Sequence, residues 1–403
     1  MPAPYRRVPK AITGYARYFV IPFVMDAAIA MAALCVNLYA QDLDATEFQL
    51  GLLGTSWALP YAAACLLTGR AADRFNRTVL LTAGLALTGT SHWLYSVSST
   101  PRHLILSAPL GGLGCAFFWP AFETLLHHPS PKETHTRMAV FNVGWTLGIM
   151  VGSGAAGYYY HAVGARWVFR TIALGLYAQS AYLLVRGAED GTAYHAASES
   201  TPHPGKRPSA RAKSTFRLIA WTANFAMWFA SSGTATVFPK LARSLHISDG
   251  RIGLLTALIM VAQVVCFAGL SRTAAWHYRL TPLIIAQVVS IAGVVTIALS
   301  SAATPFAAAM VLMGLARGVS YSASLFYGLD EETGRGGNAG IHEAVVGTAY
   351  IAGPLASGAT AQMASLRTPF WVMAGVTAAA MLAQTAMRMR VHRFSAPSDA
   401  LRQ

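Results

Sequence analysis

The sequence is poor in charged residues. Only 11% of its 403 residues are charged and 54% are hydrophobic, and the mean hydropathy is +0.44. A soluble domain carries about 25% charged residues, so this composition excludes an ordinary soluble domain. Acidic residues are the scarcer sign, 16 against 30 lysines and arginines, for a net charge of +14. A basic balance alone would suggest nucleic acid or an anionic surface, so its meaning depends on where the charges lie.

Cysteine is also scarce, and its placement excludes two kinds of scaffold. The four cysteines lie inside apolar runs without metal-ligand spacing, which argues against a disulfide framework or a zinc site. The glycine-rich stretch 334–337 has neither a preceding strand nor the lysine of a phosphate-binding loop. We therefore expect no metal, no cofactor and no ATP hydrolysis.

Long apolar runs dominate what remains. A helix needs about 20 apolar residues to cross the roughly 30 Å hydrocarbon layer. Twelve runs of this kind are present, too long and continuous for barrel strands. They predict an all-α integral membrane protein, with twelve transmembrane helices in two pseudo-symmetric six-helix bundles around a central cavity. The runs are 13–39, 48–68, 79–97, 104–126, 138–160, 167–185, 216–238, 252–270, 281–299, 305–327, 339–363 and 369–387.

The positive charges indicate the orientation of these helices. Most lysines and arginines fall on segments that are cytoplasmic if both termini are cytoplasmic, as the positive-inside rule requires. We therefore expect a multi-pass protein of the plasma (inner) membrane with both termini in the cytoplasm. The basic balance then reports topology, and nucleic acid is not an expected partner.

The longest connection divides the chain. It is rich in Pro, Ser, Ala and His, ends in a basic segment, and reads as a mobile cytoplasmic linker. The expected organisation is an N-terminal six-helix bundle at 1–186, the linker at 187–214, and a C-terminal six-helix bundle with a short basic tail at 215–403.

The two halves also resemble each other at an offset of about 202 residues. Residues 51–53 match 253–255, and the pair Thr46–Glu47 matches Ser248–Asp249, which predicts a helix N-cap in both halves. Further along, Gly152 and Gly157 align with Gly353 and Gly358. This pattern indicates an old duplication of a six-helix unit, which is common in transporters.

One loop carries a family resemblance. The segment Gly69-Arg-Ala-Ala-Asp73-Arg74-Phe-Asn76-Arg77 resembles the signature loop of the major facilitator superfamily, between the second and third spans. Asn76 stands at the usual second glycine, and because asparagine tolerates a positive φ, we expect the turn to survive. The resemblance covers essentially the whole chain and implies a secondary transporter that works by alternating access.

The fifth span carries a second likeness. Its glycines, from Gly148 to Gly157, resemble the glycine-rich motif of exporters in the family, although Ser153 replaces its proline. The eleventh span holds a version with Pro354. Close helix packing through small residues is the commoner reading, so the motif favours efflux over uptake only slightly.

Charges within spans are costly and need a reason. The resemblance implies that spans one, four, seven and ten line the cavity, which places Asp26, Arg317, Trp119 and Tyr321 there. Asp26 and Arg317 fall at similar depths, roughly 20 Å and 15 Å from the cytoplasmic side. Arg317 would bind an anionic or hydrogen-bonding group, and Asp26 would pair with it or exchange a proton. A static salt bridge is the alternative, and the aromatic residues either line the cavity or pack helices.

A second set of residues is expected to control opening. Glu123 would form a charge relay with the signature loop, and Asp73 would lie near the N-terminus of span eleven, whose dipole favours an anion. His342 and Glu343 would either couple to protons or form a structural hydrogen-bond cluster. The full gating set is Gly69, Asp73, Arg74, Arg77, Glu123, His342 and Glu343.

These observations predict a monomeric secondary active transporter. Its substrate would be a small molecule, anionic or amphipathic, with protons as the coupling ion and the lipid bilayer as its surroundings. Two alternatives stay open: a transporter-like sensor or scaffold without turnover, and an integral-membrane enzyme. An enzyme would need a tight cluster of nucleophile, acid and base at one depth, which the scattered acids do not supply.

Overall fold

The described residues form twelve α-helices and no strand. The computed structural model describes residues 13–71, 76–126, 131–187, 210–329 and 335–395. This confirms the all-α class expected from the apolar runs. The helices are α1 (Thr13–Asp42), α2 (Glu47–Ala71), α3 (Arg77–Val97), α4 (Pro101–Leu126), α5 (Pro131–Val163), α6 (Ala165–Arg186), α7 (Ala210–Ser244), α8 (Asp249–Leu270), α9 (Thr281–Leu299), α10 (Ala303–Leu329), α11 (Arg335–Met363) and α12 (Thr368–Ser395).

Length and composition suit a membrane. Within the described residues, eight helices are long and apolar enough to cross one, namely α1, α4, α5, α6, α8, α9, α10 and α12. The other four, α2, α3, α7 and α11, have 21 residues or more. At about 1.5 Å per residue, each is therefore at least about 30 Å long, the thickness of the hydrocarbon layer.

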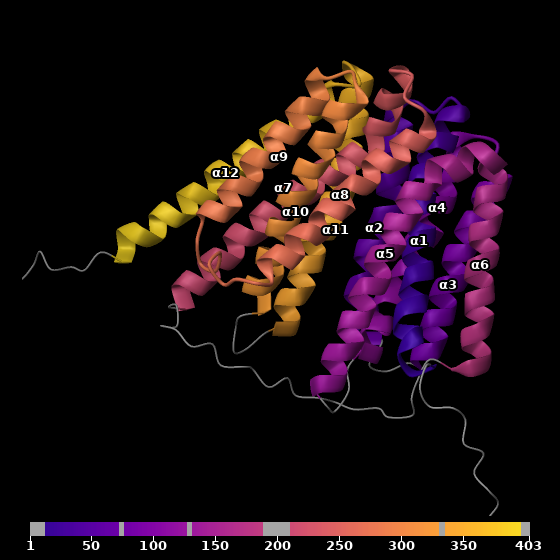
Figure 1. Ribbon diagram of the computed structural model, residues 1–403, viewed down its shortest axis with the longest axis horizontal. Helices are drawn as coiled ribbons and strands as arrows, with labels where there is room; N and C mark the ends of the chain where they lie inside the picture. The colour runs from indigo at the N-terminus through magenta and orange to yellow at the C-terminus, as the bar shows by residue number, and fades with distance from the viewer. Residues whose placement is uncertain (1–12, 72–75, 127–130, 188–209, 330–334, 396–403) are drawn as a thin grey trace, which may run out of the picture.

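The helices form two groups, α1–α6 and α7–α12 (Figure 1). We call the end at which α1 begins the near end and the end at which it finishes the far end. The first group, indigo to magenta, and the second, orange to yellow, converge at the far end and separate toward the near end. In the middle, α2 and α5 of the first group face α11 and α8 of the second.

Two glycine contacts join the groups in equivalent ways. In the α2–α11 contact, a Cβ added to Gly51 would lie 2.6 Å from the Pro354 carbonyl oxygen and 3.1 Å from the Gly358 Cα. In the α5–α8 contact, a Cβ on Gly253 would lie 3.2 Å from the backbone nitrogen of Gly157. Residues paired by the internal alignment thus occupy matching positions, and only glycine permits this backbone approach.

The remaining glycines of the two motifs act inside each group. Gly152 brings α5 against the backbone of Ala27 on α1, and Gly353 brings α11 against Ser232 on α7. Close packing through small residues therefore accounts for the glycine-rich spans, without any reference to the direction of transport.

The predicted helix caps are half right. Thr46 forms a capping box with Gln49, in which the Gln49 N–H donates to Thr46 Oγ1 (3.2 Å) and the Thr46 N–H donates to Gln49 Oε1 (3.0 Å). Ser248 precedes α8 but makes no side-chain cap bond. There the second residue of the pair, Asp249, is held by Arg243 instead.

The backbone conformation expected for Asn76 was wrong. Asn76 has φ −60°, not a positive φ, and its side-chain oxygen caps α3 by accepting the N–H groups of Thr78 (2.8 Å) and Val79 (3.4 Å). An asparagine before a helix is more useful as an extended N-cap than as a left-handed turn residue. α7 begins at Ala210, within the stretch expected to be the linker, where good helix formers occur.

Candidate functional site

The side chain of Arg317, on α10, is fixed by a hydrogen bond and by stacking on an aromatic ring. This side chain is buried, its Nε–H donates to Gln263 Oε1 at 2.5 Å, and its Cζ lies 4.7 Å from the centroid of the Trp228 ring. Among the described residues no carboxylate pairs with it. A cation stacked on an indole and fixed by an amide can still offer its other N–H groups to a ligand.

Aromatic rings continue from Arg317 toward the first group of helices. The Trp228 ring lies 6.3 Å from Tyr321 and 5.2 Å from Tyr350, and Tyr350 lies 6.4 Å from Trp57 of α2. We call Trp57, Tyr350, Trp228 and Tyr321 the aromatic band. It crosses between the two groups, so a flat apolar molecule could contact both of them at once.

Asp26 is buried on α1 but is not paired with Arg317. No hydrogen-bond or ion-pair partner is found for it in the described part of the chain, and only 7% of its surface is exposed. The static salt bridge is therefore not formed in this structure.

Trp119 lies apart from the other cavity candidates. Its ring contacts Phe118 (4.9 Å) and Phe141 (6.3 Å), within the first group of helices. The structure thus brings Arg317 and Tyr321 together and leaves Trp119 in a packing cluster. It adds Gln263, Trp228 and Tyr350, which sequence analysis did not select because helix orientation decides whether they face Arg317.

The two acids expected to control opening come from different groups. Glu123 lies near the end of α4, and Glu343 lies on α11. Both side chains are exposed, Glu343 by 54%. Glu123 lies in the last turn of α4, so its exposure is that of a side chain at a helix end. Among the ion pairs of the described residues, none joins Glu123 to Arg77.

The rest of the expected relay is described only in part. Gly69 lies in the last turn of α2 and Arg77 is the first residue of α3. Asp73 and Arg74 lie outside the described residues.

His342 is buried beside Ser324. Its Nδ1 lies 2.7 Å from Ser324 Oγ and its ring centroid 5.1 Å from that of Tyr321. Its Nε2 is 3.9 Å from Glu343 Oε1, too long for a hydrogen bond. The geometry suits a structural hydrogen-bond cluster next to the aromatic band.

Two cations on α7 hold the far end together. Lys240 Nζ lies 2.8 Å from Glu47 Oε1 and donates to the Ala45 carbonyl oxygen (3.2 Å). One turn later, Arg243 donates to Asp42 (2.7 Å) on α1 and to both oxygens of Asp249 (2.8 Å each) on α8. We call these residues the far-end ion cluster. The spacing of Lys240 and Arg243 puts both side chains on one helix face, but it does not indicate their partners on other helices.

The pKa of Glu47 makes this cluster sensitive to acid. The hydrogen bond from Lys240 holds the pKa of the Glu47 carboxyl below its ordinary value of 4.5. A lowered pKa in the folded state adds stability above that value, which is lost as the pH falls through it. We expect acidification below about pH 4.5 to lower the melting temperature more in wild type than in Glu47→Gln. Both side chains are about a quarter exposed, so the difference should not exceed about 1 kcal/mol.

Asp44 supplies the control for this experiment. It is exposed at the same end and makes no side-chain bond in the described structure. Asp44→Asn should therefore keep the wild-type acid response. Equal acid responses in wild type and Glu47→Gln would rule out a contribution from the Lys240–Glu47 contact.

The fold is that of membrane transporters. A peptide transporter POT variant superposes with a TM-score of 0.75 at 14% identity, over 96% of this chain and 96% of that one. The nucleoside transporter NupG gives 0.72 at 12% identity, over 93% and 99%. A bacterial homologue of the human lysosomal transporter Spinster, inward-facing and unoccupied, gives 0.65 at 15% identity, over 94% and 95%.

The chain belongs to the Major Facilitator Superfamily, whose sequence model matches residues 18–219 and 220–401. The quinolone resistance protein NorA of Staphylococcus aureus (strain MRSA252) is 27% identical over 140 residues, 34% of this chain and 36% of that protein. An uncharacterized MFS-type transporter of Methanocaldococcus jannaschii is 26% identical over 135 residues, 33% of this chain and 35% of that protein. These matches span about a third of each relative. Membership makes the chain a multi-pass integral membrane protein of a transporter family.

Proposed function

We propose that the protein is a secondary active transporter that moves a small molecule by alternating access, coupled to protons, in the direction of efflux. One observation carries this proposal. Asp26 on α1 and Arg317 on α10 are buried in different groups of helices, and neither has an oppositely charged partner among the described residues. A charge kept in a membrane span without a partner is a costly feature that marks a substrate or proton pathway.

Alternating access would use the two groups of helices, α1–α6 and α7–α12, as its moving parts. The near end would be cytoplasmic, in agreement with the distribution of lysine and arginine. The present conformation would then be open to the cytoplasm and closed outside by the far-end ion cluster and the two glycine contacts. Glu123, Glu343 and the signature loop would control the closing of the near end.

The substrate would be a flat, amphipathic molecule with an anionic group. The aromatic band offers faces for a ring system, and Arg317 offers donors for a carboxylate. NorA, to which part of this chain is similar, is named for resistance to quinolones. The efflux direction rests on that partial relationship.

Proton coupling would use Asp26. A carboxyl group that is shielded from water in one conformation and hydrated in the other can take up a proton on one side of the membrane and release it on the other side. A sensor or scaffold without turnover is the second candidate. It would have no need for an unpaired acid at this depth, so Asp26 favours transport.

Reconstitution tests the proposal. Purified protein in liposomes that contain a pH-sensitive dye would be exposed to a fluorescent quinolone under an imposed pH gradient. We expect drug movement and proton movement together in wild type, and loss of the coupled proton movement in Asp26→Asn. Drug movement without proton movement would overturn the coupling, and binding without either would favour the sensor.

A further inference from the structure

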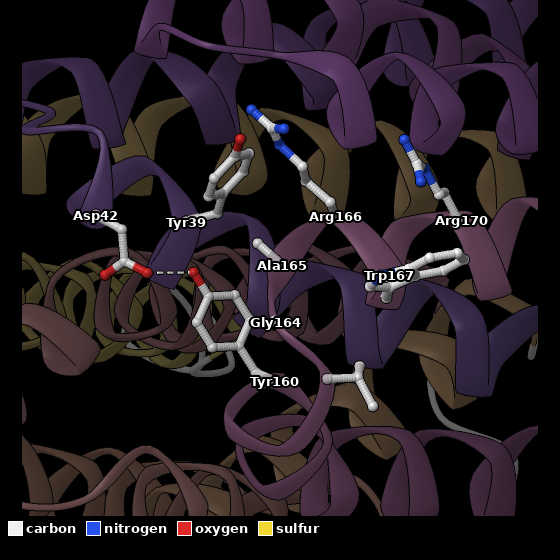
Figure 2. Close-up of a pocket in the computed structure, with 9 residues that line it drawn as sticks. Tyr39, Asp42, Tyr160, Gly164, Ala165, Arg166, Trp167 and Arg170 are labelled. Carbon is white, nitrogen blue, oxygen red and sulfur yellow. Dashed lines mark hydrogen bonds between the residues drawn. The ribbon is translucent and has the colours of Figure 1, made fainter.

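A pocket at the far end of the first group lies away from the aromatic band. It has a volume of about 560 Å³ and is formed by the ends of α1 and α5 and the start of α6. Figure 2 shows Tyr160 bonded to Asp42 on one side, and Arg166, Trp167 and Arg170 along α6 on the other.

The pocket has two positive charges without a matching negative one. Arg166 and Arg170 are one helical turn apart, and neither makes an ion pair or hydrogen bond with the described residues. Arg170 stacks on Trp167, with its Cζ 5.0 Å from the ring, and its Nε is buried without a partner. The acid in the lining, Asp42, is already held by Tyr160 and Arg243. The pocket therefore has the charge and the free N–H donors to bind an anion.

The position on α6 identifies the kind of anion. The helical spacing of Arg166 and Arg170 continues on the same face to Leu174 and Leu184, which are 56% and 65% exposed, as lipid-facing residues are. The 22 residues of α6 span about 33 Å, close to the thickness of the hydrocarbon layer. The two guanidinium groups thus stand where this lipid-facing stripe ends, at the level of the headgroups. Trp167, 57% exposed, is the residue type enriched at that level.

We propose that this pocket binds the phosphate of an anionic phospholipid headgroup, with Arg166 and Arg170 as its ligands and Trp167 against the acyl-chain boundary. In the expected orientation the lipid belongs to the outer leaflet. Asp42 connects the pocket to the far-end ion cluster, so the bound headgroup adjoins the contact that closes the outer side.

The test compares lipids on the purified full-length protein. Phosphatidylglycerol, phosphatidylcholine and inorganic phosphate would each be titrated in detergent, with melting temperature and lipid retention in native mass spectrometry as readouts. We expect phosphatidylglycerol to raise the melting temperature more than phosphatidylcholine, because a ligand of the folded state stabilises it by mass action. Equal effects of the two lipids in wild type would overturn the proposal, and this comparison needs no variant.

Variants then locate the site. One basic side chain near an anionic surface contributes about fivefold in affinity, so R166Q/R170Q should bind phosphatidylglycerol about thirtyfold more weakly. Arg102→Gln is the matched control, an exposed arginine at the same end outside the pocket, and should bind as wild type does. R166K/R170K keeps both charges and should retain the lipid preference. Unchanged binding in R166Q/R170Q, or an equal effect of inorganic phosphate alone, would show that the pocket is not a lipid site.

Discussion

Replacing Arg317 with glutamine should lower the transport rate roughly ten- to hundredfold, in protein that still inserts and folds. The guanidinium group stacks on Trp228 of the aromatic band. Its remaining N–H groups bond no carboxylate of the described chain. A hydrogen bond to a charged group contributes about 1.5–3 kcal/mol, which corresponds to this range of substrate affinity. Initial rates of drug movement in liposomes, with drug binding followed by tryptophan fluorescence, would measure it.

Arg317→Lys separates charge from shape. Lysine keeps the positive charge but cannot stack as a plane on Trp228 while it donates to Gln263. We expect it to bind an anionic drug better than Arg317→Gln does and still transport below the wild-type rate. Arg251→Gln, an exposed arginine of α8, is the control and should transport normally. Wild-type rates in Arg317→Gln would remove Arg317 from the substrate site.

Replacing Gly157 with alanine should shift the protein away from the conformation described here. The new methyl group would overlap the Asp249 carbonyl oxygen and lie 2.8 Å from the Gly250 nitrogen. These are backbone atoms that cannot rotate away, so α5 and α8 must separate. Overpacking of this kind costs about 1–3 kcal/mol, enough to change a two-state equilibrium roughly 5- to 150-fold. Pulsed electron resonance between spin labels at positions 102 and 251 should show longer distances across the far end.

Gly154→Ala provides the matched control on the same helix. Its Cβ would lie 3.8 Å from Ala257 Cβ and 3.9 Å from Leu254 Cδ2, which are ordinary contacts. Both substitutions raise helix propensity by about the same amount, so that effect cancels in the comparison. Only Gly157→Ala should change the label distance. Equal distances in the two variants would mean that the α5–α8 contact does not hold the far end closed.

The twelve helices were predictable because a membrane selects for apolar runs of one length. Their order, and the shared depth of Asp26 and Arg317, follow from that length and the rise per residue. Depth does not say which way a side chain points. The orientation of α10 turns Arg317 toward Gln263 and Trp228 rather than Asp26, and this depends on how four helices pack. The far-end ion cluster escaped prediction for the same reason, since its partners lie about 200 residues apart.

The paired glycine contacts explain which traces of the duplication survive. Each contact joins one copy of the repeated unit to the other copy, so a side chain gained at either Gly51 or Gly253 would collide with the opposite copy's backbone. The same holds for Gly157 and Gly358. After the duplication the two copies could drift apart in their loops: Ala275 stands at the position that aligns with Asp73 of the signature loop at the offset of 202 residues. At these four positions a side chain in one copy would collide with the backbone of the other copy, so both copies still carry glycine.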